Sequence, residues 1–138
     1  MSASDDERRV WRVLLADDQP ELRRLMTMTL EFDGRLEVVA AASSGAEAIS
    51  MAHEVRPDLA VLDQMLGGPV TGLDVAGHLR ATQPHVKLIL FSAASHEDDL
   101  LAGRVDELVT KTDISDLGDI ALRVLEGPGR DGAPTPAE

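Results

Sequence analysis

The chain has 138 residues, of which 43% are hydrophobic and 28% charged, a composition typical of one compact domain rather than a disordered or collagen-like chain. Its formal net charge of −12 comes from 25 acidic and 13 basic residues, and it argues against direct binding to nucleic acid or a membrane surface. The absence of cysteine excludes disulfides and thiolate zinc sites.

Both ends of the chain are polar. Residues 1–9 lack the basic patch and apolar run of a secretory signal, and no apolar stretch is long enough to cross a bilayer, so we expect a cytoplasmic protein. Residues 127–138 read GPGRDGAPTPAE and offer no large apolar side chain to bury. We therefore expect a flexible arm over 1–9, one domain over 10–126 and a flexible tail over 127–138.

Five short apolar runs alternate with segments of helical period, which predicts a parallel sheet with helices on its faces. The runs lack strict polar alternation, as expected of strands that are buried on both sides. The predicted strands are residues 10–16, 36–41, 58–62, 86–91 and 107–110.

The first predicted helix begins at Pro20, whose fixed φ suits the first turn. Its apolar residues recur at helical spacing, and we expect that face to pack on the sheet. They are Leu22, Leu25, Met26 and Leu30.

The remaining helices are predicted from capping and breaking residues. Ser43 or Ser44 caps the second helix, and Pro57 prevents its continuation. A third helix follows Gly72. The last two predicted helices begin at Ser95 and at an N-cap on Asp113, and end near Gly103 and Gly127.

Polar side chains follow four of the five predicted strands. They are Asp17 and Asp18 after the first, Asp63 after the third, Ser92 after the fourth and Lys111 after the fifth. Because the carboxyl ends of parallel strands meet at one edge of a sheet, we expect these groups to converge there. An Asp-Asp pair alone is usually a solvated turn, so the convergence of the pair with Asp63, Ser92 and Lys111 carries the prediction.

Three crowded carboxylates repel unless a cation shares them, and Mg²⁺ prefers such oxygen ligands. An aspartate can also attack phosphorus and form an acyl phosphate, provided that positive charge neutralises the phosphoryl oxygens. The sequence therefore indicates a Mg²⁺-dependent phosphoacceptor.

The chain resembles the response-regulator receiver domains of two-component signalling, in the CheY-like superfamily, over residues 10–126. The motifs that carry the resemblance are LLADDQP with Asp17 and Asp18, LAVLD with Asp63, LILFSA with Ser92, and LVTK with Lys111. The resemblance implies an α/β flavodoxin-like doubly wound (βα)5 fold whose five-stranded parallel sheet has the order 2-1-3-4-5.

The resemblance also implies the roles of these residues. Asp63 accepts a phosphoryl group from a sensor histidine kinase or phosphotransfer protein, and Ser92 and Lys111 bind the phosphoryl oxygens. Asp17, Asp18, Asp63 and the backbone carbonyl of Met65 hold Mg²⁺. The domain catalyses its own phosphorylation and dephosphorylation but is not otherwise an enzyme. Phosphorylation changes binding to a downstream protein, and it can promote a homodimer.

Two features depart from the family pattern. Gly72 lies nine residues after Asp63, where receivers have a glycine eight residues after the acceptor, so one residue is inserted in this loop. Leu108 stands where receivers usually carry an aromatic switch residue. Either a smaller aliphatic repacking transmits the signal, or the output uses another surface.

We expect a stand-alone receiver, because residues 127–138 cannot form a second domain. A receiver truncated from a DNA-binding response regulator is the main alternative. Another is a receiver-like scaffold that no longer responds to phosphorylation. A magnesium phosphohydrolase is disfavoured, because such enzymes usually place two aspartates one residue apart, whereas Asp17 and Asp18 are adjacent.

Overall fold

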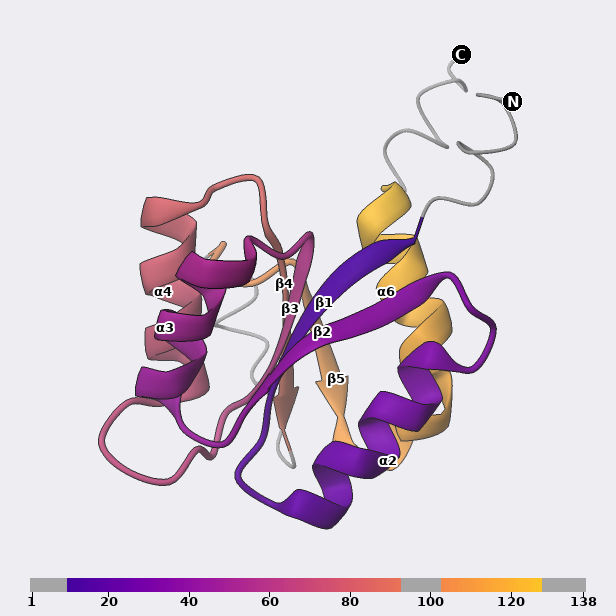
Figure 1. The fold of residues 1–138 in the computed structure, drawn as a ribbon, viewed down its shortest axis with the longest axis horizontal. Coiled ribbons are helices and arrows are strands. Elements are labelled where there is room, and N and C mark those ends of the chain that lie inside the picture. The colour runs from indigo at the N-terminus through magenta and orange to yellow at the C-terminus, as the bar shows by residue number, and fades with distance from the viewer. Residues whose placement is uncertain (1–9, 93–102, 128–138) are drawn as a thin grey trace.

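A single parallel sheet forms the centre of the protein (Figure 1). The structure, a computed structural model, describes residues 10–92 and 103–127. The sheet has the order β2-β1-β3-β4-β5, which confirms the predicted α/β fold and strand order. Each predicted strand is correct to within one residue at either end. The strands are β1 (Trp11–Ala16), β2 (Leu36–Ala42), β3 (Leu59–Asp63), β4 (Lys87–Ser92) and β5 (Glu107–Thr110).

Helices cover both faces of this sheet. α2 (Pro20–Glu31) and α6 (Leu117–Glu126) lie side by side on one face, and α3 (Gly45–Val55) and α4 (Gly72–Thr82) pack together on the other (Figure 1). A 3-10 helix, η1 (Lys111–Asp116), connects β5 to α6. No helix among the described residues is long and apolar enough to span a membrane.

The strands divide the interior into two cores. Along β1, Val13 and Leu15 pack toward α2 and α6, whereas Leu14 and Ala16 pack toward α3 and α4, and all four are fully buried. This alternation follows from the two-residue period of a strand. Because helices cover both faces, the middle of the interior strands is a continuous apolar run without polar alternation, as the sequence predicted.

Local caps fix where the helices begin. α2 begins at Pro20, as predicted. Ser44, and not Ser43, is the N-cap of α3, where its hydroxyl oxygen accepts a hydrogen bond from the Glu47 amide at 3.1 Å. α4 begins with a reciprocal capping box in which Thr71 and Asp74 each accept a hydrogen bond from the other's backbone amide.

Two predictions about helices were wrong. Leu25 does not face the sheet: it is 46% exposed, whereas Met26 and Leu30 are buried. The last α-helix begins at Leu117 rather than after an N-cap on Asp113, because the preceding residues form the tighter turns of η1. The predicted helix from Ser95, the arm over 1–9 and most of the tail over 127–138 lie outside the described residues.

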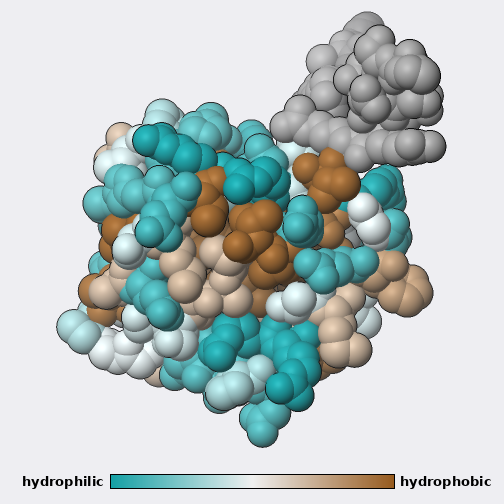
Figure 2. All heavy atoms as spheres, viewed as in Figure 1, coloured by the Kyte–Doolittle hydropathy of each residue, from teal (hydrophilic) through white to brown (hydrophobic). Residues whose placement is uncertain are grey.

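The edge strand β2 is only half covered. Val38, Val39 and Ala40 are each partly exposed. Apolar side chains gather over the middle of the face seen in Figure 2, where β2 runs in Figure 1. The interior strands β1, β3 and β4, by contrast, are buried along most of their length.

Candidate functional site

Three carboxylates meet at the carboxyl edge of the sheet, as the strand pattern predicted. Asp17 and Asp18 follow β1, and Asp63 is the last residue of β3. One carboxylate oxygen of each lies within 4.8 Å of the others. Asp17 and Asp63 are buried, at 0% and 1% exposure, whereas Asp18 is exposed. Solvent and small ions therefore reach the cluster on the side of Asp18.

Asp63 is held by two donors. Its Oδ1 accepts a hydrogen bond from the Met65 amide at 3.0 Å, and its Oδ2 accepts one from the Lys111 ammonium at 3.1 Å. Lys111 is the first residue of η1, directly after β5, and its Nζ lies 5.7 Å from the centroid of the buried Phe91 ring. The close ammonium opposes the cost of burying the Asp63 carboxylate.

Asp17 has the least compensated charge of the three carboxylates. Its Oδ1 accepts a hydrogen bond from the Gln19 amide at 2.8 Å, but its buried Oδ2 has no hydrogen-bond partner among the described residues. Burial, and to a lesser extent the neighbouring Asp63, raises the pKa of Asp17 to about 6, although the Gln19 amide and the Lys111 ammonium both act to lower it. Asp17 is thus the group whose ionisation most needs another positive charge.

This donor set fits a hard divalent cation. The Asp17 Oδ2 is buried without a hydrogen-bond donor among the described residues and lies beside two more carboxylates, which is energetically unfavourable for the protein alone. The same arrangement of oxygens is favourable for coordinating a divalent cation. The exposure of Asp18 leaves room for the waters that Mg²⁺ keeps. The residues present therefore fit the predicted Mg²⁺ site.

Arg23 supports the loop before α2, a role that the sequence prediction missed. Its Nη1 donates a hydrogen bond to the Asp17 carbonyl at 2.7 Å. One feature of the sequence could have indicated this role. Arg23 is a cation near the N-terminus of a helix, where the helix dipole disfavours positive charge, so a nearby acceptor for its guanidinium was to be expected.

The lengthened loop after Asp63 is tied down at several points. The Gln64 side-chain oxygen accepts a hydrogen bond from the Leu73 amide at 3.0 Å, and Gly67 forms an isolated parallel bridge with Ser44. A Cβ on Gly72 would collide with the Asp63 carbonyl, so glycine is needed where α4 approaches the end of β3. The Met65 side chain points outward and is 70% exposed.

The structure also brings Ser92 to this edge. Ser92 ends β4 one residue beyond Phe91, which is paired with Asp63, and it is only 4% exposed. Leu108, at the position of the family's aromatic switch, is half-buried against the core under α3 and α4. The aliphatic side chain therefore packs against this face of the sheet and stays partly exposed to solvent.

Known proteins share both the sequence pattern and the fold. Residues 13–117 match the family of response regulator receiver domains. The chain belongs to this family. This receiver domain is 33% identical over 120 residues to the nitrate/nitrite response regulator protein homolog of Haemophilus influenzae, covering 84% of the chain and 57% of that protein.

Other relatives give the same assignment. The probable transcriptional regulatory protein TcrX of Mycobacterium tuberculosis is 37% identical over 102 residues, which are 72% of this chain and 42% of that protein. The receiver thus spans about half the length of these curated relatives.

Solved structures agree with the fold. The response regulator protein TrrA of Thermotoga maritima, solved in complex with Mg²⁺-BeF, superposes with a TM-score of 0.74 at 32% identity, covering 83% of this chain and 99% of that one. A LuxR-family two-component response regulator from Aurantimonas superposes with a TM-score of 0.78 at 27% identity, covering 86% of each chain.

Proposed function

We propose that this receiver domain, over residues 10–126, accepts a phosphoryl group on Asp63 from a histidine kinase or phosphotransfer protein in the cytoplasm. The observation that supports this most directly is the surroundings of Asp63. Its carboxylate is buried beside two further carboxylates, and the Lys111 ammonium lies 3.1 Å from Oδ2. The similar response regulator TrrA, which was solved in complex with Mg²⁺-BeF, also supports the proposal.

In the proposed reaction an Asp63 carboxylate oxygen attacks phosphorus, an O–P bond forms, and the P–N bond to the donor histidine breaks. The Lys111 ammonium neutralises one phosphoryl oxygen, and the Ser92 hydroxyl, at the end of β4, donates to another. Asp17, Asp18, Asp63 and the Met65 carbonyl would hold Mg²⁺, which would supply the remaining positive charge. Water later attacks the same phosphorus, the O–P bond to Asp63 breaks, inorganic phosphate leaves, and the carboxylate is restored.

The proposed output is a change in protein binding. Moving Ser92 toward a phosphoryl oxygen pulls on the end of β4, and Leu108 on the neighbouring β5 repacks against the core under α3 and α4. The expected partner is a downstream protein that distinguishes the two states.

A receiver that works joined to a DNA-binding domain is the second candidate. It is favoured by the similarity to LuxR-family response regulators and by the greater length of the curated relatives. Intact mass of the protein isolated from its source cells separates this candidate from a stand-alone receiver.

Intact mass spectrometry after incubation with acetyl phosphate and Mg²⁺ tests the phosphoacceptor proposal. We expect one phosphoryl adduct that hydroxylamine removes, as it removes an acyl phosphate, and that is absent in Asp63→Asn and when the metal is chelated. Asp119→Asn is the matched control, because this exposed aspartate on α6 should leave the adduct unchanged. No adduct on the native protein would instead support a phosphorylation-independent scaffold, whereas an adduct that persists in Asp63→Asn would place the acceptor on another residue.

A further inference from the structure

Two histidines meet between the helices that cover one face of the sheet. His53 lies in the last turn of α3, and His78 lies in the second half of α4. Their Nε2 atoms are 3.3 Å apart, and their ring planes are at 81°. The two residues are 25 positions apart in the sequence, so they form no short metal-binding motif. The packing of α3 on α4 is what brings the two imidazoles together.

The distance between the two nitrogens suits a shared metal ion. Two nitrogen ligands at about 2.0 to 2.1 Å from a tetrahedral Zn²⁺ lie about 3.3 to 3.4 Å from each other. The observed 3.3 Å is longer than the usual range of about 2.7 to 3.2 Å for an N–H···O hydrogen bond. The ring centroids are 5.4 Å apart and the nitrogens only 3.3 Å, so each ring turns its Nε2 toward the other.

We propose that His53 and His78 together bind one transition-metal ion of the Zn²⁺ class, which bridges α3 and α4. Neutral imidazole suits Zn²⁺, Ni²⁺ and Cu²⁺, whereas Mg²⁺ prefers oxygen ligands, so this site and the acidic cluster select different ions. Water fills the remaining coordination positions, because His53 is exposed and His78 is half-buried. Without the ion, one neutral ring donates its Nε2 proton to the other; when the ion binds, that ring carries its proton on Nδ1 instead.

The backbone around the histidine pair is held by hydrogen bonds. The buried Gln83 side chain, at the end of α4, donates to the Ala52 carbonyl at 3.1 Å, directly before His53. The Thr82 hydroxyl donates to the His78 carbonyl at 2.9 Å. Both ligands therefore stand on helices that are already tied to each other. Such ligands lose little conformational freedom when an ion binds, which favours binding.

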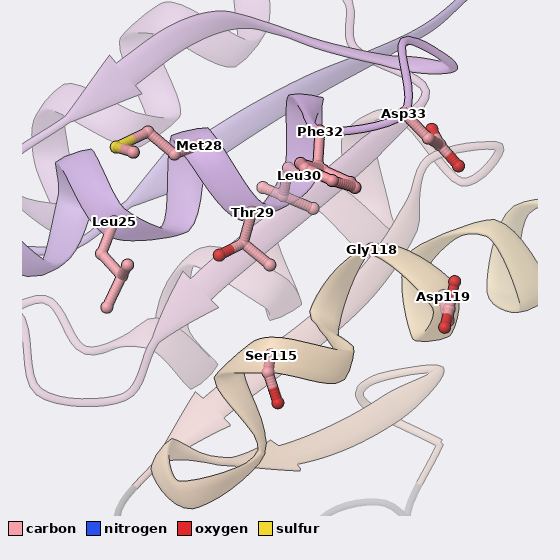
Figure 3. Close-up of a pocket in the computed structure, with 9 residues that line it drawn as sticks. All are labelled: Leu25, Met28, Thr29, Leu30, Phe32, Asp33, Ser115, Gly118 and Asp119. Atoms are coloured by element: carbon pink, nitrogen blue, oxygen red, sulfur yellow. The ribbon is translucent and has the colours of Figure 1, made fainter.

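The histidine pair lies apart from the other sites of the molecule. α3 and α4 each connect two parallel strands and so run antiparallel to them, which places their C-terminal halves away from the carboxyl edge that carries Asp63. The groove between α2 and the η1–α6 segment, shown in Figure 3, lies on the opposite face of the sheet. The partial negative charge at the end of α3 and the net charge of −12 both favour a cation at the pair.

Calorimetric titration with ZnCl₂ in excess Mg²⁺ tests this site. The native chain should bind one Zn²⁺, and His53→Gln and His78→Gln should each weaken that binding at least tenfold, because a single imidazole remains. His85→Gln is the matched control, since this exposed histidine lies in the turn before β4 and its loss should leave the affinity unchanged. A loss in only one of the two variants overturns the proposal. So does binding that Asp18→Asn abolishes and both histidine variants keep, because the ion then occupies the acidic cluster.

Imidazole ¹⁵N NMR spectra of the native chain identify the ligand atoms without any substitution. Zn²⁺ should shift the Nε2 resonances of His53 and His78 together, and the shifts should be complete at one Zn²⁺ per chain. The His85 resonances should stay in place over the same range of Zn²⁺. Shifts of equal size at His85, or a shift at only one member of the pair, mean adventitious binding to surface imidazoles and overturn the proposal. Unshifted resonances at both members overturn it as well.

Discussion

Asp17 carries the clearest electrostatic cost in the protein. Its folded-state pKa is raised from 3.8 to about 6 by burial and by Asp63, so the folded state binds more protons than the unfolded state between these values. The cost is absent below pH 4, grows as the pH rises through this window, and is fully present above pH 6. A carboxylate kept at such a cost is easier to understand as a ligand than as a structural residue.

Asp17→Asn should therefore stabilise the metal-free protein at pH 7.5. We expect a gain of about 1 kcal/mol, discounted for water that reaches the cluster beside Asp18. Urea unfolding in the presence of a chelator measures this gain, and the gain should vanish near pH 4. Equal stability changes at the two pH values would contradict the assigned cause.

Lys111 provides the second test at the scale of a single residue. Lys111→Gln removes the ammonium 3.1 Å from Asp63 Oδ2, so the developing charge on the phosphoryl group loses its nearest cation within the described chain. We expect the rate of phosphorylation by acetyl phosphate to fall at least tenfold. Lys87→Gln, at the opposite end of β4, is the control and should keep the native rate.

At the scale of secondary structure, the glycines of α4 differ in what they do. Gly72→Ala should destabilise the protein by more than about 2 kcal/mol, because its Cβ would collide with the Asp63 carbonyl at the end of β3. Gly77→Ala has open space around it in the same helix and should stabilise by about 0.5 to 1 kcal/mol. Thermal unfolding of both variants checks the contrast, and equal effects would refute it.

Most elements could be predicted because their boundaries have local causes. Pro20 and Ser44 mark helix starts, and the apolar runs that form strands end at polar residues such as Asp63. Leu25 was placed wrongly because helical spacing identifies a stripe but cannot say which of two neighbouring stripes faces inward. Asp113 is a residue type that often caps helices, but the chain forms η1 at this position. Whether a segment forms a 3-10 helix or an α-helix depends on its tertiary contacts, which the spacing of apolar residues in the sequence does not reveal.

The site was predictable for a related reason. Strand ends in an open parallel sheet lie at one edge, so Asp17, Asp63 and Lys111 could be placed together before their distances were known. The contacts of Arg23 and Gln64 could not be predicted from the sequence, because each contact depends on the path of a loop. Loop conformation follows from packing between distant segments, such as the bridge between Ser44 and Gly67, and not from local pattern.

At the scale of the whole molecule, Mg²⁺ should stabilise the fold by binding the acidic cluster. When the free Mg²⁺ concentration is a hundred times the dissociation constant, we expect the free energy of unfolding to rise by about 2.7 kcal/mol. The measurement is thermal unfolding with MgCl₂ against NaCl of equal ionic strength, since a chain of charge −12 gains from screening alone. Asp18→Asn should lose most of the Mg²⁺-specific gain, and an undiminished gain there would place the ion elsewhere.

The strand order also bears on how the protein is made. Lys111 follows Asp63 by 48 residues and comes directly after the edge strand β5. A ribosome that adds about 5 to 20 residues per second needs roughly 2 to 10 seconds to synthesise this interval. The nascent chain can pair β1, β2 and β3 before then. The carboxylates of Asp17, Asp18 and Asp63 can therefore come together before Lys111 has been synthesised. During translation, cations of the surrounding solution can supply the counter-charge that Lys111 provides in the finished protein.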